Sequence, residues 1–313
     1  MNFLIGLLLR AGFGFLRLLG PRFAPALGAF LARNLGPITP AHRIGRDNIA
    51  AAFPEKTAAE RAAILTEAWD NLGRTACEYV HMDRIWDFDP ENPKPGGLIS
   101  ASAETVALYE RLRDDGKPAI VFSAHLANWE LPAVAAAKHG IDSAVLYRTP
   151  NNAAVAREIL RLRKDSMGVL VPAGMGAPLR LARALEAGQH IGMLVDQRFG
   201  RGPRVMFMGR EATANPLLAQ LARRYDCPVH GARAIRLPGG RFRLDLTEEI
   251  PLPRDAEGLI DINAATQKMN EVIEGWVREY PGQWLWMHRR WRDAPAPETK
   301  GMFPEVRDEG GDA

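Results

Sequence analysis

The stretch that decides the fold is residues 118–132, PAIVFSAHLANWELP. Its first six residues, PAIVFS, form an apolar run that predicts a buried strand. Asn128 is a favoured residue at a helix N-cap, and Pro132 is tolerated only near the start of a helix. We therefore expect a strand that passes through a short loop into a helix over residues 128–139.

The same alternation of strand and helix signals extends on both sides of this stretch. Further strands are predicted at 142–147, 168–171 and 190–195, and a hairpin at 228–236 and 241–247. Apolar spacing and cap signals predict helices at 57–82, 102–115, 153–165, 176–187, 215–225 and 262–280. The first of these helices should begin with a capping box of Thr57 and Glu60. This order predicts an α/β fold with a largely parallel central sheet flanked by helices.

Composition and charge divide the chain into three parts. With 47% hydrophobic and 25% charged residues the chain is globular, which excludes a disordered chain and a disulfide scaffold. Residues 1–46 hold six arginines and no acid, so the whole-chain charge of +3 leaves −3 for the remainder. We expect a basic apolar membrane-associating segment at 1–46, an α/β domain at 47–292 and a polar tail at 293–313. Cys77 and Cys227 lack metal-ligand spacing, which argues against a zinc site, and the scarcity of cysteines fits a reducing compartment.

The N-terminal segment is apolar but interrupted by arginines. Its longest uninterrupted apolar run, residues 3–9, is too short to span a bilayer, which takes about 20 residues. Arg10 and Arg17 share a helical face, so we expect a helix lying in the membrane surface, with its arginines meeting anionic lipid. The alternatives are a tilted span with snorkelling arginines and a helix packed on the protein's own core. A cleavable signal peptide fits poorly, because arginines interrupt the apolar run.

The strongest chemical candidate is a histidine and an acid five residues apart, His125 and Glu130. The spacing is not specific by itself, because it also occurs at His42/Asp47 and His288/Asp293. Among the three, only His125 follows a predicted strand and precedes a helix, and ligands bind at the carboxyl ends of strands in open α/β sheets. With His125 in the loop and Glu130 in the first helical turn, the two side chains can meet.

A carboxylate hydrogen-bonded to one imidazole nitrogen fixes the tautomer and strengthens the other nitrogen as a general base. Such a base suits removal of a proton from an alcohol that attacks an activated acyl group, without a covalent enzyme intermediate. The alternatives are a structural histidine and a Glu130 that faces solvent. The sequence contains no G-x-S-x-G elbow of a nucleophile hydrolase and no G-x-x-x-x-G-K-[ST] phosphate loop.

The block from His125 to Glu130 resembles the H-x-x-x-x-D/E signature of the lysophospholipid acyltransferase superfamily. Within it, the chain resembles the bacterial lipid A biosynthesis acyltransferases of lauroyl/myristoyl type. Four further segments carry the resemblance: NIAAAFP (48–54), YRTPN (147–151), VDQ (195–197) and PGQWLWMHRRW (281–291). Together the matches cover about residues 1–292. One departure is Gly282, where the family often has an acidic or another polar residue.

The resemblance implies a glycerol-phosphate-acyltransferase-like fold and an O-acyltransferase at the cytoplasmic face of the bacterial inner membrane. Such an enzyme moves a fatty acyl chain from acyl carrier protein to a hydroxyl of a lipid A precursor. Its partners would be the carrier protein, the precursor and membrane lipids, with no cofactor, metal or nucleic acid. Carried onto this sequence, the catalytic pair is His125 with Glu130, and the substrate-binding residues are Arg148, Asn151, Asp196 and Gln197. Arg148 would contact phosphate or stabilise charge near the site.

Several alternatives stay open at this level. The chain could acylate another polar membrane lipid (a phospholipid, an aminolipid or a phosphatidylinositol mannoside), or it could be a non-catalytic peripheral lipid-binding protein. The segment WLWMHRRW, residues 284–291, fits either a buried aromatic anchor or a membrane interface. Arg198 and Arg201, in a glycine-rich loop, fit either phosphate binding or an ordinary surface.

Overall fold

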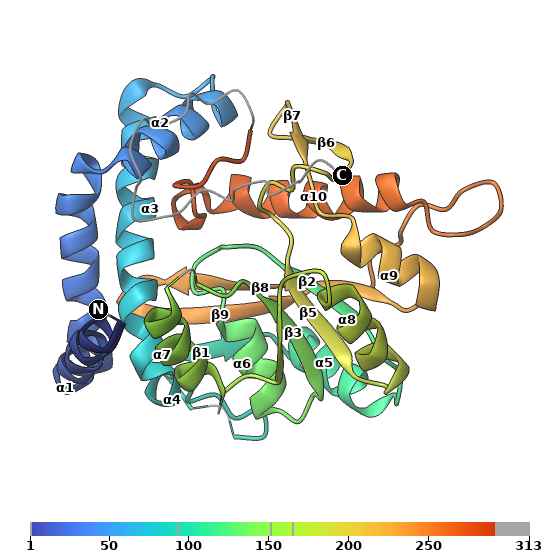
Figure 1. Ribbon diagram of the computed structural model, residues 1–313, viewed down its shortest axis with the longest axis horizontal. Coiled ribbons are helices and arrows are strands. Elements are labelled where there is room, and N and C mark those ends of the chain that lie inside the picture. Colours follow the sequence, from blue (N-terminus) through green and yellow to red (C-terminus); the bar gives the residue numbers. More distant parts are fainter. Residues whose placement is uncertain (1, 93, 151, 165, 292–313) are drawn as a thin grey trace.

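The computed structural model, which describes residues 2–92, 94–150, 152–164 and 166–291, has a seven-stranded sheet at its centre (Figure 1). The strand order is β1-β9-β8-β2-β5-β3-β4. All neighbours are parallel except β8 and β9, which form the expected antiparallel hairpin. The predicted largely parallel sheet is thus confirmed. The strands are β1 (Ile99–Ala101), β2 (Ile120–Ser123), β3 (Ser143–Tyr147), β4 (Val169–Pro172), β5 (His190–Leu194), β8 (Val229–Leu237) and β9 (Arg241–Leu246).

Helices cover both faces of the sheet, as Figure 1 shows for α5 and α6 on one side and α10 on the other. Leu131 and Val134 of α6 share a buried cluster with Leu244 of β9, and Trp276 of α10 stacks on Phe122 of β2 with ring centroids 5.8 Å apart. The covering helices are α5 (Ala103–Asp114), α6 (Leu131–Lys138), α7 (Ala153–Lys164), α8 (Ala177–Glu186), α9 (Leu217–Tyr225) and α10 (Ile262–Glu279).

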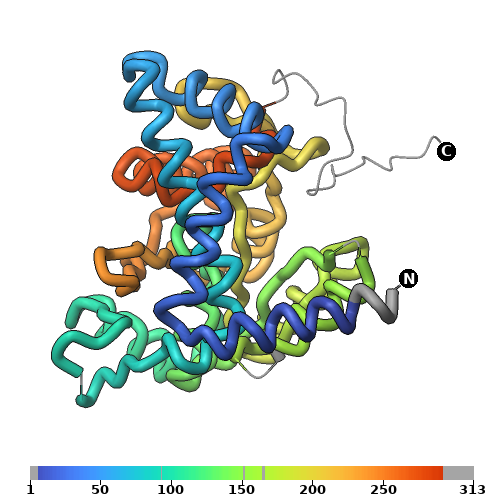
Figure 2. The backbone as a smooth tube through the Cα atoms, turned by 90° about the vertical axis from the view of Figure 1, so that its left-hand side faces the viewer, coloured from blue at the N-terminus to red at the C-terminus, as the bar shows by residue number. Residues whose placement is uncertain are grey.

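The N-terminal helices form a layer beside the sheet. They are α1 (Asn2–Leu35), α2 (Pro40–Ala52), α3 (Ala58–Glu78) and α4 (Met82–Ile85). The capping box of Thr57 and Glu60 is present at the start of α3, as predicted. Figure 2 shows α1 bent into two arms, and the bend lies at Gly20, whose φ of +79° breaks the helix before Pro21. The second arm packs closely on α3, where a Cβ on Gly28 would lie 2.2 Å from the carbonyl oxygen of Gly73.

The order of the strands places the loops that carry the site at one edge of the sheet. Because β2, β3 and β5 are parallel, the segments after them leave the sheet at the same edge. The order along the chain would place β3, which ends before Arg148, next to β2, which ends before His125. Instead β5 lies between them, because the chain returns from β4 through α8 and inserts β5 into the gap. The residues that follow β5 therefore lie nearest to His125.

A small hairpin, β6 (Arg204–Phe207) and β7 (Arg210–Thr213), was not predicted from the sequence. Its turn residues, Met208 and Gly209, both have positive φ values, of 54° and 72°. That geometry is usual in two-residue hairpins, but the sequence signal is normally Asn-Gly or Asp-Gly, so methionine hid the turn. The hairpin is fixed to α10, since Glu274 accepts a hydrogen bond from the backbone N–H of Met208 at 2.6 Å.

The tryptophan-rich segment is part of the core. Trp284, Trp286 and Trp291 are all buried, and so is Arg290. The ring of Trp284 meets that of Trp286 edge-on, with centroids 4.6 Å apart. Of the two interpretations of this segment, the structure favours the buried aromatic anchor. The anchor lies against the edge of the sheet where β5 ends.

Candidate active site

His125 lies directly against Asp196, which follows the neighbouring strand β5. Imidazole Nδ1 lies 2.8 Å from Oδ1 of Asp196, and the backbone N–H of His125 donates to Oδ2 of the same carboxylate at 2.9 Å. The two residues meet because Ser123 and Leu194 are in register in adjacent parallel strands, so the segments that follow leave the sheet side by side. The Asp196 side chain is fully buried, whereas that of His125 is 17% exposed.

Further contacts settle which imidazole nitrogen can act as a base. The indole N–H of Trp284 donates to Oδ2 of Asp196 at 2.7 Å, so the carboxylate accepts three hydrogen bonds. A carboxylate next to Nδ1 places the ring proton on Nδ1 and leaves Nε2 as the acceptor. The side-chain amide nitrogen of Gln197 lies 3.4 Å from Nε2, in position to donate to it.

The electrostatics keep Asp196 ionised. Burial alone would raise the pKa of Asp196, but the electrostatic interaction with the His125 imidazole and the hydrogen bonds from its ring and backbone N–H hold that pKa well below the usual range. Arg290, also buried, donates to the carbonyl of Thr213 at 2.8 Å and to Oδ1 of Asn270 at 2.7 Å. Burial lowers the pKa of Arg290 to about 10, against the opposing effect of Asp196. Arg290 therefore stays charged near neutral pH and balances the buried carboxylate.

Glu130 does not form the hydrogen bond with His125 that the spacing predicted. Within the described chain, its buried carboxylate is bound by the hydroxyl of Tyr79 and by the guanidinium of Arg163 in α7. The cause is the backbone between the two residues. Ala127 has a φ of +48° and the following turn delays the helix, so α6 begins at Leu131 and Glu130 precedes its first turn. The hydrogen-bonded pair expected from the sequence is wrong, and Asp196 is the carboxylate partner of His125.

The same delay changes the role of Asn128. The expected N-cap residue lies two positions before the observed one, which is Glu130. The Oδ1 atom of Asn128 accepts from the backbone N–H of Glu130 at 3.3 Å, and its Nδ2 donates to Glu78 at 2.9 Å. Asn128 is therefore bound by Glu78 of α3, and it stabilises the turn before α6 instead of capping the helix.

The other substrate-binding candidates differ in their surroundings. Gln197 touches His125, as described above, while Arg148 is exposed at the end of β3. Asn151 lies outside the described residues. Arg198 and Arg201, in the loop after β5, are exposed as well, and neither they nor Arg148 form an ion pair with a described residue. This edge of the sheet therefore presents, after β3 and β5, three guanidinium groups that pair with no described carboxylate.

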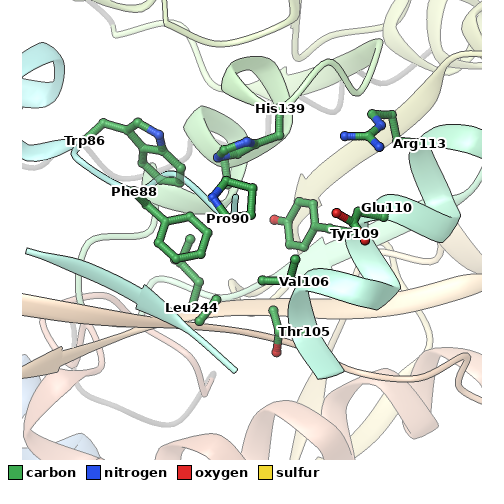
Figure 3. Close-up of a pocket in the computed structure, with 12 residues that line it drawn as sticks. Trp86, Phe88, Pro90, Thr105, Val106, Tyr109, Glu110, Arg113, His139 and Leu244 are labelled. Atoms are coloured by element: carbon green, nitrogen blue, oxygen red, sulfur yellow. The ribbon is translucent and has the colours of Figure 1, made fainter. Parts of the chain in front are cut away.

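A pocket elsewhere in the protein is not part of this site. It is lined by aromatic side chains that include Trp86, Phe88, Tyr109 and His139 (Figure 3). None of the predicted site residues lines it. His139 follows the last residue of α6, an eight-residue helix about 12 Å long, so the pocket lies toward the opposite end of α6 from the loop that carries His125.

The described residues hold no cluster of three or more His, Cys, Asp or Glu side chains that could bind a metal ion. Cys77 and Cys227 are free, buried thiols. Burial raises the pKa of the Cys227 thiol to about 11, which makes it a poor nucleophile at neutral pH.

The first arm of α1 half-buries Leu9, Phe13 and Leu16, and it exposes both its arginines and several large apolar side chains. Arg10 pairs with buried Glu158 of α7 at 2.7 Å, and Arg17 pairs with Asp83 at 2.6 Å. Both arginine side chains nevertheless stay largely exposed, at 67% and 44%, so their expected contact with lipid stays a prediction. The exposed large apolar side chains of α1 include Leu7, Leu8, Phe15, Leu18 and Phe23. By length and composition, residues 6–38 could cross a membrane.

Comparison with known proteins places this fold and site in one class of enzyme, the acyltransferases of lipid A biosynthesis. Residues 3–293 match the family model of the bacterial lipid A biosynthesis acyltransferases, and the chain belongs to that family. A similar protein is the lipid A biosynthesis palmitoleoyltransferase of Escherichia coli (strain K12), which is 26% identical over 292 residues, covering 90% of this chain and 86% of the relative. The lipid A biosynthesis acyltransferase of Shigella flexneri matches to the same extent.

Proposed function

We propose that the protein transfers a fatty acyl chain from an acyl thioester to a hydroxyl of a lipid A precursor, with His125 as general base and Asp196 as the residue that orients it. The observation that carries the proposal is the 2.8 Å contact between Nδ1 of His125 and Oδ1 of Asp196. It leaves Nε2 as the basic nitrogen on a partly exposed side chain at the carboxyl edge of the sheet.

The proposed reaction balances without a cofactor. Nε2 of His125 takes the proton of the lipid hydroxyl as the oxygen attacks the thioester carbonyl carbon. The C–O bond forms, the C–S bond of the tetrahedral intermediate breaks, and the imidazolium returns the proton to the departing thiolate. Asp196 stays ionised throughout and stabilises the imidazolium, which is the role of the carboxylate in comparable histidine-based sites.

Negative charge develops on the thioester oxygen and needs hydrogen-bond donors. Within the described chain, the backbone N–H groups of Asn128 and Trp129 donate to no protein acceptor, and both lie a few residues after His125. They follow the left-handed Ala127 and immediately precede α6. We assign these two amides as the donors to the oxyanion, where the helix dipole adds to their effect.

The substrates are proposed on chemical grounds together with family membership. Arg148, Arg198 and Arg201 are exposed and pair with no described residue, and they suit the phosphates of a lipid A precursor, since arginine binds phosphate through two parallel N–H donors. Gln197 would bind the acceptor hydroxyl beside Nε2. Acyl carrier protein is the proposed acyl donor, and the enzyme would work at the cytoplasmic face of the inner membrane. Its attachment there is supported by the outward apolar side chains of α1.

A transfer assay with defined substrates tests the proposal. Lauroyl, myristoyl and palmitoleoyl thioesters of acyl carrier protein and of coenzyme A are offered with a lipid A precursor or a glycerophospholipid, and the product's mass and acylated position are determined. His125→Ala should lower kcat about 10²–10⁴-fold. His42→Gln, at a histidine whose acid five residues later, Asp47, is also described, is the matched control and should keep activity. Acylation of the glycerophospholipid alone, or full activity of His125→Ala, would overturn the proposal.

A further inference from the structure

Helix α3 buries a polar stripe directly beneath the loop that carries His125. Asn71, Thr75 and Glu78 follow one another at spacings of four and three residues, so they share one face of the helix, and all three are buried. Buried polar side chains on a helix otherwise packed with apolar residues need a partner to satisfy them. Their partners are the catalytic loop and one arginine.

The stripe holds the strained residue of the loop. Ala127, two positions after His125, has a φ of +48°, a left-handed conformation that side chains other than glycine rarely adopt. Its carbonyl accepts from Thr75 Oγ1 at 3.0 Å and from Asn71 Nδ2 at 3.2 Å. Its N–H donates to the carbonyl of Gln283 at 2.9 Å. The peptide groups on both sides of Ala127 are thus fixed by side chains and backbone from distant segments.

One cation, whose side chain is only 10% exposed, binds all three residues of the stripe. Arg236 of β8 donates from Nε to Oδ1 of Asn71 at 2.8 Å and from Nη2 to Thr75 Oγ1 at 3.1 Å, and its guanidinium pairs with both oxygens of Glu78. Glu78 in turn accepts from Nδ2 of Asn128, the residue after Ala127. These contacts form a closed network in which each side chain that donates to the loop is itself held in place by Arg236.

We propose that Asn71, Thr75, Glu78 and Arg236 are positioning residues, a clamp whose work is to keep Ala127 in its left-handed conformation. Because that conformation turns the chain between His125 and the amides of Asn128 and Trp129, the clamp sets the base and the oxyanion donors relative to each other. The inference rests on the proposed function, since it assumes that His125 acts as the base. Without the clamp, Ala127 relaxes to negative φ and the loop changes its path.

A glycine substitution at position 127 distinguishes this positioning role from an ordinary contribution to stability. Glycine adopts positive φ without a steric penalty, so a loop with glycine at position 127 depends less on the clamp. Thr75→Val removes the hydroxyl but keeps the shape, and we expect it to lower kcat about 10-fold in the otherwise unchanged protein, which corresponds to about 1.4 kcal/mol. In the Ala127→Gly background the same change should lower kcat less than about 3-fold, while KM for the lipid acceptor stays nearly constant.

Two control variants accompany this comparison of Thr75→Val with and without Ala127→Gly. Thr75→Ser keeps the hydroxyl and should retain activity close to that of the unchanged protein. Thr266→Val removes an equally buried hydroxyl, whose bond is to Ile262 within α10, and should leave kcat unchanged. The melting temperature of each full-length variant is measured in detergent, so that activity refers to folded protein. If Thr75→Val does not fold, Asn71→Ser removes the other donor to the Ala127 carbonyl and is tested in the same two backgrounds.

The outcomes separate this inference from the function it rests on. An equal loss of kcat with and without Ala127→Gly, or an unchanged kcat for Thr75→Val, overturns the clamp while His125→Ala remains inactive. If His125→Ala keeps its activity, the proposed function itself fails. A smaller loss in the Ala127→Gly background, with no effect of Thr266→Val, supports the clamp, because a merely structural hydroxyl would not be relieved by glycine 52 positions later in the chain.

Discussion

Trp284 donates its indole N–H to Oδ2 of Asp196 at 2.7 Å, on the carboxylate whose other oxygen lies 2.8 Å from Nδ1 of His125. The three residues come from the end of β5, the loop after β2 and the tryptophan-rich segment near residue 290. A buried carboxylate that accepts every donor around it has a fixed orientation. The imidazole it holds is fixed for the same reason.

Replacement of Asp196 by asparagine should lower kcat about 10²–10⁴-fold with little change in KM. Asp196 accepts from His125 Nδ1, the His125 backbone N–H and the Trp284 indole N–H. An asparagine has only one accepting oxygen, so at least one of these N–H groups would face the N–H donors of the amide. Steady-state acyl transfer measures the effect. Asp255→Asn, in a loop fixed to Arg223, is the control and should keep kcat. A kcat for Asp196→Asn within about 5-fold of the unchanged protein would contradict the role of Asp196 in orienting the base.

Glu130 and Arg163 should depend on each other for stability. Their ion pair is buried, so Glu130→Gln leaves an uncompensated cation and Arg163→Met an uncompensated carboxylate, each lowering the free energy of unfolding by about 3 kcal/mol. The double variant should be more stable than the sum of the two single losses predicts. Urea denaturation in detergent measures the three values. Additive losses would show that the two charges do not compensate each other.

Stability should fall as the pH falls below about 6.5, partly through His288. Burial, opposed by Asp196, lowers the pKa of His288 to about 4, so between these pH values the unfolded chain binds a proton that the folded chain does not. The contribution is complete above pH 6.5 and is lost progressively toward pH 4, by about 3 kcal/mol in total. The melting temperature, followed from about pH 7.5 to pH 5, should change less in His288→Asn.

Asparagine can keep the donor to the Leu285 carbonyl, which Nδ1 of His288 contacts at 2.7 Å, so the substitution removes the titration and preserves the bond. Burial also lowers the pKa values of His42, His81, His139 and His190. The fall of the melting temperature with falling pH should therefore be reduced in His288→Asn and not abolished. An unchanged slope would mean that His288 titrates alike in the folded and unfolded states.

Membrane binding should depend on the apolar side chains of α1 more than on its arginines. Leu8 and Leu18 are 66% and 88% exposed, whereas Arg10 and Arg17 are paired with Glu158 and Asp83. Leu8→Ser combined with Leu18→Ser should lower the partition into lipid vesicles about 10-fold or more. Vesicle sedimentation at low and high salt measures it, and binding by the unchanged protein should weaken little with salt.

Met175→Ser is the matched control for that experiment, because Met175 is a fully exposed apolar residue outside α1. Its loss should leave partition unchanged. A partition that falls steeply with salt and does not change with the leucine substitutions would instead support the expectation that the arginines meet anionic lipid.

Local sequence patterns predicted most of the elements but not every boundary. Apart from the β6–β7 hairpin, the strands and helices after residue 102 follow apolar periodicity and cap signals, and these act within a few residues of each other. The start of α6 is the clearest failure, since Asn128 and Pro132 indicated a helix from residue 128 and the helix begins at Leu131. The left-handed Ala127 delays it, and the hydrogen bonds to that residue come from Asn71, Thr75 and Gln283, which no local pattern includes.

The sequence by itself determined the α/β class, the position of His125 after a strand and the apolar nature of the N-terminal helix, because each depends on neighbouring residues. Only the tertiary structure decided which acid meets that histidine. Glu130 is close in the chain, but Arg163 binds it, and Asp196 comes into contact because β5 inserts beside β2. Strand order is set by the packing of the whole sheet, so a partner 71 residues away cannot be recognised from spacing.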